Sequence, residues 1–94
     1  MNLFSEKFSN IFTTYSEKFN NENFESISIG DDRNKVDILL GKPIYLSKDN
    51  VNQDSTKLNY WYSKNLFFGL SYNKVVVQFY EDKVVNKIRV VDSD

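Results

Sequence analysis

Three short runs in the C-terminal half of the chain are rich in β-branched and aromatic residues, the types that favour strands. They span about residues 58–64, 74–80 and 83–91. Only Glu81 and Asp82 separate the last two runs, which is the length of a two-residue hairpin turn. The C-terminal half is therefore predicted to form an antiparallel sheet.

The register of the predicted hairpin follows from the need to bury one face of a sheet. With Glu81 and Asp82 as the turn, the predicted pairs are Phe79–Val84, Val77–Asn86 and Val75–Ile88. The face toward the core is then expected to hold Val75, Val77, Phe79, Val84, Ile88 and Val90. The opposite face is expected to hold Val76, Gln78, Tyr80, Lys83, Val85, Lys87 and Arg89.

A helix is predicted at about residues 33–40, because start and stop signals flank it. Asp31 or Asp32 can cap its N-terminus, where a carboxylate accepts hydrogen bonds from free N–H groups. Gly41 can adopt the backbone conformation that ends a helix, and Pro43 cannot continue one.

A second helix is predicted over residues 3–19, where apolar residues recur every three or four positions. The apolar stripe consists of Phe4, Phe8, Ile11, Tyr15 and Phe19. It is expected to pack on the domain's own sheet, on a partner or on a second copy of the chain. Three asparagines then interrupt the pattern, and Phe24 and Ile27 are compatible with a short helical turn.

Between the central helix and the first strand-like run, the chain is mostly polar. Residues 44–46 are compatible with the start of a strand. Residues 47–57 are rich in Ser, Asp, Asn, Gln and Lys and are predicted to form a mobile loop.

These elements predict one α+β domain over residues 1–94, a length that suits a single core. Its helical segments are expected to pack on one face of a three- to four-stranded antiparallel sheet. Residues 1–20 form an additional N-terminal helix in this prediction, and residues 24–91 form the core of the domain.

Four motifs occur in a fixed order along residues 24–91. They are Gly30-Asp31-Asp32-Arg33-Asn34-Lys35-Val36, Leu40-Gly41-Lys42-Pro43, Tyr60-Trp61-Tyr62, and the final hairpin from Val75 to Ile88. In this order they resemble the SmpA/OmlA (BamE-like) family and, more loosely, half of the β-lactamase inhibitor protein. The resemblance implies a BLIP-like fold with two helical segments on one face of an antiparallel sheet. It also implies a function in binding other proteins, as an envelope-assembly subunit or an inhibitor.

The composition argues against catalysis and against metal binding. The chain has neither His nor Cys, so Ser-His and Cys-His nucleophile systems and ordinary zinc sites are excluded. Asn50, Asn52 and Asp54 alternate as in a calcium loop, but Ser55 and Trp61 stand where that loop needs Gly and Glu. No enzymatic activity, catalytic residue, cofactor or metal is predicted.

The predicted function is non-catalytic binding of a protein partner through exposed aromatic residues. If Leu58, Tyr60 and Tyr62 face the helices, Trp61 points to the other side. The predicted contact patch consists of Trp61, Phe67, Phe68, Tyr72 and Tyr80. The alternatives are that the N-terminal helix covers this face as a second core, or that two copies of the chain form a homodimer through it.

Two other functions remain open. One is an inhibitor or immunity-type protein that blocks another protein. The other is a weak nucleic-acid-binding sheet, in which Lys83, Lys87 and Arg89 flank Tyr80 and Trp61. The net charge of −1 gives no reason to expect nucleic acid.

The localisation depends on the true start of the chain. No apolar run is long enough to span a membrane, and Glu6 and Lys7 interrupt any signal-peptide core. A cytoplasmic protein is expected if Met1 is the native start. A trimmed mature chain is instead expected in the periplasm or at the outer membrane.

Overall fold

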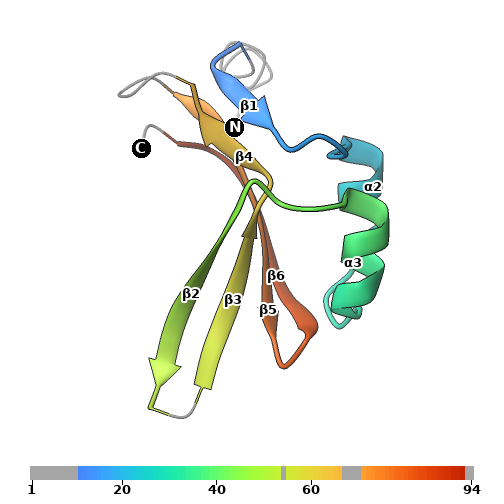
Figure 1. The fold of residues 1–94 in the computed structure, drawn as a ribbon, viewed down its shortest axis with the longest axis vertical. Helices are drawn as coiled ribbons and strands as arrows, with labels where there is room; N and C mark the ends of the chain where they lie inside the picture. Colours follow the sequence, from blue (N-terminus) through green and yellow to red (C-terminus); the bar gives the residue numbers. More distant parts are fainter. Residues whose placement is uncertain (1–10, 54, 67–70, 93–94) are drawn as a thin grey trace.

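The computed structural model describes residues 11–53, 55–66 and 71–92, drawn in colour in Figure 1. In chain order the elements are β1 Thr13–Tyr15, α2 Asn21–Ser26, α3 Arg33–Leu40, β2 Tyr45–Asn52, β3 Ser55–Trp61, β4 Ser63–Asn65, β5 Tyr72–Tyr80 and β6 Lys83–Asp92. The strands form two antiparallel sheets, one with the order β2-β3-β5-β6 and one that pairs β1 with β4. The predicted α+β class is confirmed. No helix within the described residues is long and apolar enough to cross a membrane.

The core lies between the two helices and one face of the larger sheet, as Figure 1 shows. The helices contribute Phe24, Ile27, Val36 and Leu40; the strands and their connection contribute Tyr60, Tyr62, Val75, Val77, Phe79 and Val84. We call this the helix face of the sheet and the opposite side the outer face. The described members of this core do not include a residue of β2.

The central helix agrees with the sequence prediction. Helix α3 spans Arg33–Leu40, and Gly41 follows it with φ at 68° and donates its N–H to Asp37. Asp32 stands at the N-cap position, but its carboxylate makes no capping hydrogen bond and instead pairs with Lys83. The predicted capping by the Asp32 side chain is therefore wrong.

The N-terminal helix predicted over residues 3–19 is wrong where the structure describes it, and residues 3–10 lie outside the described part. Residues 13–15 form strand β1, paired with β4 in the smaller sheet. Two aromatic residues of the predicted helical stripe, Tyr15 and Phe19, are instead spaced so that their rings stack, with centroids 5.2 Å apart. Both rings pack against the core, Tyr15 from an extended segment and Phe19 from the end of a turn. Asn20 does not simply break a helix, because its side chain accepts the Asn23 N–H and caps α2.

The mobile loop predicted at residues 47–57 is also wrong. Strand β2 runs to Asn52 and β3 begins at Ser55. The segment is polar because β2 is an edge strand that contributes nothing to the described core, and charged side chains on an edge discourage pairing with other chains.

The final hairpin has the predicted turn but only part of the predicted register. Tyr80 pairs with Lys83 and Phe79 with Val84, as expected. A β-bulge follows, in which Gln78 pairs with Asn86 and Val85 has no partner in the ladder.

Beyond the bulge, every β6 side chain lies on the face opposite to the prediction. Lys87 and Arg89 pair with Val77 and Val75 and therefore lie on the helix face. Ile88 and Val90, which were predicted to enter the core, pair with Val76 and Lys74 and lie on the outer face.

Lys87 gives the physical reason for the bulge. Its ammonium group donates hydrogen bonds to the backbone carbonyls of Phe24 and Ile27, at 2.9 and 2.7 Å. It also lies 4.8 Å from the centroid of the Phe24 ring. A cation satisfies the unpaired carbonyls at the C-terminus of a helix and interacts favourably with its dipole. Lys87 thereby fastens α2 to the sheet.

The turn of the hairpin adopts a left-handed backbone without glycine, with φ at 50° for Glu81 and 64° for Asp82. The start of α3 holds it in place. The Arg33 N–H donates to the Asp82 carbonyl at 2.9 Å, and the Arg33 guanidinium pairs with the Asp82 carboxylate at 3.2 Å. These contacts fix a turn that its own sequence does not favour.

We expect Lys87→Met to lower the free energy of unfolding by about 2 kcal/mol, because buried carbonyls at the end of α2 lose a charged donor. Urea denaturation measures this change. Lys57→Met is the control, because Lys57 makes no ion pair with any described residue. Equal losses in the two variants would contradict the capping role.

A second prediction concerns Asp31, whose pKa lies below its ordinary value of 3.8 because its carboxylate accepts the Ser28 N–H and pairs with Lys35. A lowered pKa means that the ionised form stabilises the folded state above the ordinary pKa, and that this contribution is lost as the pH falls. The stability gap between wild type and Asp31→Asn should be constant from about pH 7 to 5 and should shrink below about pH 4. Thermal unfolding across this range tests it; a gap that persists at about pH 2 would count against it.

Candidate partner-binding groove

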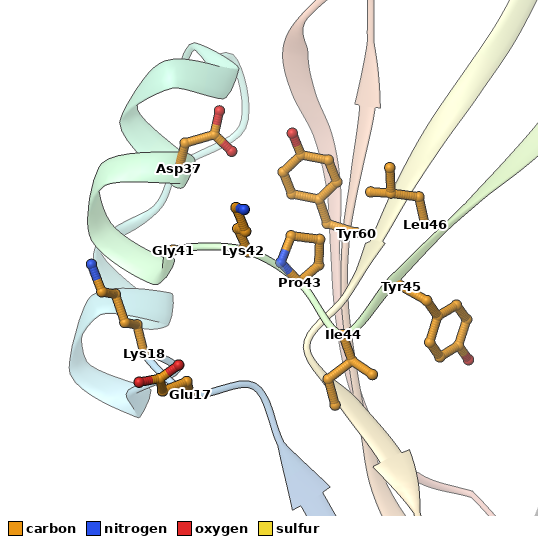
Figure 2. Close-up of a pocket in the computed structure, with 10 residues that line it drawn as sticks. All are labelled: Glu17, Lys18, Asp37, Gly41, Lys42, Pro43, Ile44, Tyr45, Leu46 and Tyr60. Carbon is orange, nitrogen blue, oxygen red and sulfur yellow. The ribbon is translucent and has the colours of Figure 1, made fainter.

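A groove of about 800 Å³ lies between α3 and the start of β2 (Figure 2). Its lining residues are Glu17, Lys18, Asp37, Gly41, Lys42, Pro43, Ile44, Tyr45, Leu46 and Tyr60. In Figure 2, Asp37 of α3 and Tyr60 of β3 face each other across the hollow, and the segment from Gly41 to Ile44 crosses below them.

The local sequence explains why an apolar segment lies here. Gly41 ends α3 with a positive φ, and an added Cβ at this position would lie 2.9 Å from the Lys18 side chain. Pro43 prevents the helix from continuing. The Ile44 N–H then donates to the Trp61 carbonyl at 2.7 Å, which directs the chain onto the sheet edge. The run from Pro43 to Leu46 consequently lies along the groove.

The groove contains one polar pair. The Tyr60 hydroxyl and the Asp37 carboxylate face each other across the hollow. Burial raises the pKa of Tyr60, and the negative charge of Asp37 raises it further. The Tyr60 hydroxyl therefore remains a neutral phenol at neutral pH. It supplies neither an activated nucleophile nor a base poised near pH 7.

No metal centre is apparent in the described ranges, because no three Asp or Glu side chains come together there as a possible ligand set. A smaller hollow of about 330 Å³ adjoins the groove and shares Glu17, Lys42, Pro43 and Ile44 with it. It adds Ser16 and Lys64 to the lining. The groove can therefore offer apolar contact and charged rims.

Trp61 lies on the outer face of the sheet, where its ring is held between two neighbours. The Tyr45 ring stacks on it with centroids 5.0 Å apart, and the Lys74 ammonium lies 4.9 Å from its centroid. The indole N–H donates to the Ser47 hydroxyl at 2.8 Å. The more accessible ring of this stack is that of Tyr45, which is 44% exposed.

Of the aromatic residues predicted to form a patch, the three that the structure describes, Trp61, Tyr72 and Tyr80, share the outer face but do not converge. Trp61 and Tyr80 are partly buried, and Tyr72 is 4% exposed. Tyr72 and Tyr80 lie at opposite ends of β5, eight residues or about 27 Å apart along an extended strand. Phe67 and Phe68 lie outside the described residues.

The basic residues named for a nucleic-acid surface do not gather around Trp61 either. Lys87 caps α2 on the helix face, and Arg89 pairs there with Glu25 at 3.4 Å. Lys83 lies far along β6 and pairs with Asp32.

Sequence reasoning missed Tyr45, Leu46 and Lys42 as surface residues. A signal for them was present, because the apolar run from Pro43 to Leu46 follows directly after a strong helix stop. Its significance depends on β2 being an edge strand, which a single sequence does not reveal.

Comparisons with protein family models, with curated proteins and with solved structures found no match.

Two tyrosines of the core, Tyr60 and Tyr62, allow a matched test of how much a hydroxyl group contributes to stability with and without a polar neighbour. Tyr60→Phe should lower the free energy of unfolding by about 1 kcal/mol, because the Asp37 carboxylate loses the hydroxyl group that faces it. Tyr62→Phe should be neutral or stabilising, because the buried Tyr62 hydroxyl has no hydrogen-bond partner among the described residues. Urea denaturation of both variants checks the difference, and a larger loss for Tyr62→Phe would contradict it.

Proposed function

We propose that this chain is a non-catalytic domain that binds another protein through the groove beside β2. The observation that carries the proposal is the open apolar groove of about 800 Å³ at the edge of the sheet, next to a single Asp–Tyr pair. A binding site needs apolar area with a few oriented polar groups, whereas an enzyme needs a positioned acid, base or nucleophile.

Exposed apolar side chains at the groove support the proposal. Leu46 of the edge strand is 56% exposed and shares the helix face with its partner Tyr60, whereas the Tyr45 ring lies on the outer face against Trp61. Large side chains of this kind become binding anchors when a partner buries them. Their neighbours Pro43 and Ile44 extend the apolar area along the same segment.

A relationship to the SmpA/OmlA (BamE-like) family is part of the proposal. What supports it is the order of elements, in which α2 and α3 precede β2, β3, β5 and β6 of the antiparallel sheet. A protein-binding role is what that resemblance implies.

A photo-crosslinking experiment tests the groove directly. Leu46 is replaced by p-benzoylphenylalanine in the full chain, expressed in the cells that naturally make it. Val51 is the matched control, because it lies on the same strand and is 55% exposed, but does not line the groove. We expect a crosslinked adduct with a different protein at position 46 and none at position 51.

A second variant measures the energetic contribution of the anchor. Leu46→Ser should weaken binding of the crosslinked protein by about thirtyfold, the effect of losing an anchor worth about 2 kcal/mol. Equal adducts at both positions, no adduct at position 46, or an adduct with the mass of two identical chains would each overturn the proposal.

A further inference from the structure

The larger sheet has two edges, and they differ in how well they are protected against pairing with another strand. Strand β6 forms one edge, where the bulge at Val85 interrupts the ladder and turns two charged side chains, Lys87 and Arg89, onto the helix face. Bulges and inward-pointing charges are two devices that protect sheet edges. The other edge is β2 (Figure 1), whose ladder with β3 is regular from Tyr45 to Asn50.

The first half of β2 is the open part of this edge. Lys48 and Asp49 place charges on the strand, which discourages pairing there, but the preceding segment from Tyr45 to Ser47 is uncharged. An edge strand presents a row of backbone N–H and C=O groups along its free side. In the described part of the chain, β2 pairs with β3 alone, and this segment makes no other backbone hydrogen bond. Its free side can therefore pair with a further strand.

A row of side-chain hydrogen bonds on the outer face ends at Ser47. Gln78 donates to Asn59, and Asn59 donates to the Ser47 hydroxyl at 3.1 Å. The direction of these bonds is fixed at both ends. The Trp61 indole, which can only donate, also bonds to the Ser47 oxygen at 2.8 Å. At the other end, Gln78 donates to the Asp49 carboxylate, which can only accept.

The Ser47 hydroxyl is consequently left with a proton to donate. A serine hydroxyl has two acceptor lone pairs and one proton, and both lone pairs of Ser47 are used by donors on β3. The proton therefore faces away from β3. Among the residues that the structure describes, none accepts it. The open edge thus offers a hydrogen-bond donor beside the exposed side chains of Tyr45 and Leu46.

We propose that β2 binds an extended segment of the partner protein as a fifth strand of the sheet, antiparallel to the residues from Tyr45 to Ser47. This inference rests on the proposed function and specifies how its partner binds. The orientation follows the other ladders of this sheet, which are all antiparallel. Three successive residues of the segment, read from its N-terminus, then lie opposite Ser47, Leu46 and Tyr45.

The neighbour on β2 determines the side chain at each of these three positions. The first position has a short acceptor, Asp, Asn, Ser or Thr, for the Ser47 proton. The second has an apolar side chain that contacts Leu46, which is 56% exposed. The third has an aromatic side chain that lies on the Tyr45 ring, on the side away from its stacking partner Trp61.

A second copy of β2 leaves one of these requirements unmet. A two-fold axis perpendicular to the sheet keeps both helix faces on one side, so paired residues have numbers of the same parity. Pairing about Tyr45 sets Pro43, which has no acceptor side chain, against Ser47. Pairing about Leu46 sets the Tyr45 ring against Ser47. Pairing about Ser47 sets Lys48 against Leu46, and pairing about Lys48 places two like charges side by side.

The first experiment selects peptides that bind the full chain from a phage-displayed library of random twelve-residue sequences. We expect the selected peptides to share a run of three residues, in the order short acceptor, apolar and aromatic. Selection of peptides without this run, or of none at all, would overturn the inference.

The second experiment tests whether the peptide binds as a strand. Each backbone N–H of the most enriched peptide is methylated in turn, and binding to the full chain is measured by fluorescence anisotropy. In an antiparallel pair, only alternate residues direct their N–H groups toward a given neighbour. We expect methylation to weaken binding by about tenfold or more at every second position of the run, and by less than about threefold between them. Equal losses at successive positions would contradict strand addition.

A matched set of variants tests the hydroxyl group at the edge. Ser47→Ala should weaken binding of the same peptide by about tenfold, whereas Ser47→Thr keeps the hydroxyl and should stay within about twofold of wild type. Ser55→Ala is the control, because its hydroxyl bonds to Asn52 at the far end of the β2–β3 ladder. Equal binding by the Ala and Thr variants at position 47, or an equal loss in the control, would count against the donor role.

The outcomes separate this inference from the proposed function. A crosslink at position 46 combined with methylation losses that do not alternate would retain the protein-binding groove and reject strand addition. No crosslink and no enriched peptide would reject both.

Discussion

The contact between Lys87 and the end of α2 determines where the helices lie on the sheet. Its ammonium group holds the carbonyls of Phe24 and Ile27, and this requires Lys87 to lie on the helix face of β6. The bulge at Val85 provides that orientation by shifting the strand by one residue. A lysine placed in this way replaces the basic last turn that α2 itself lacks.

The position of the helices in turn creates the groove. The core joins α2 and α3 to residues of β3, β5 and β6, and none of its described members comes from β2. The helix face of β2 is consequently left open beside α3, where the segment from Pro43 to Leu46 becomes one side of the hollow. Its lining combines this apolar segment with two lysines, Lys18 and Lys42, and two carboxylates, Glu17 and Asp37.

Several particular features show how far the sequence could be read. Helix α3 was predictable, because Gly41 and Pro43 act on their own immediate backbone. The two-residue turn was predictable from chain spacing, although its left-handed conformation is held by Arg33 from a distant segment. The loop predicted at residues 47–57 was wrong, because its polarity reflects an edge strand. The predicted N-terminal helix was wrong over the described residues 11–19, because residues 13–15 pair with β4 and Tyr15 and Phe19 pack against the core. Among the features that form the groove, the sequence predicted only helix α3 and the start of a strand at residues 44–46.

The sequence by itself determined the α+β class, the bounds of α3, the hairpin turn and the lack of imidazole and thiol chemistry. These follow from composition and from interactions between residues close in the chain. Only the tertiary structure decided the register beyond Val85, the pairing of β1 with β4 and the open edge at β2. Ile88 is apolar and was expected in the core, but the carbonyl groups of α2, about 60 residues away in the chain, hold Lys87 on the helix face and so place Ile88 on the outer face.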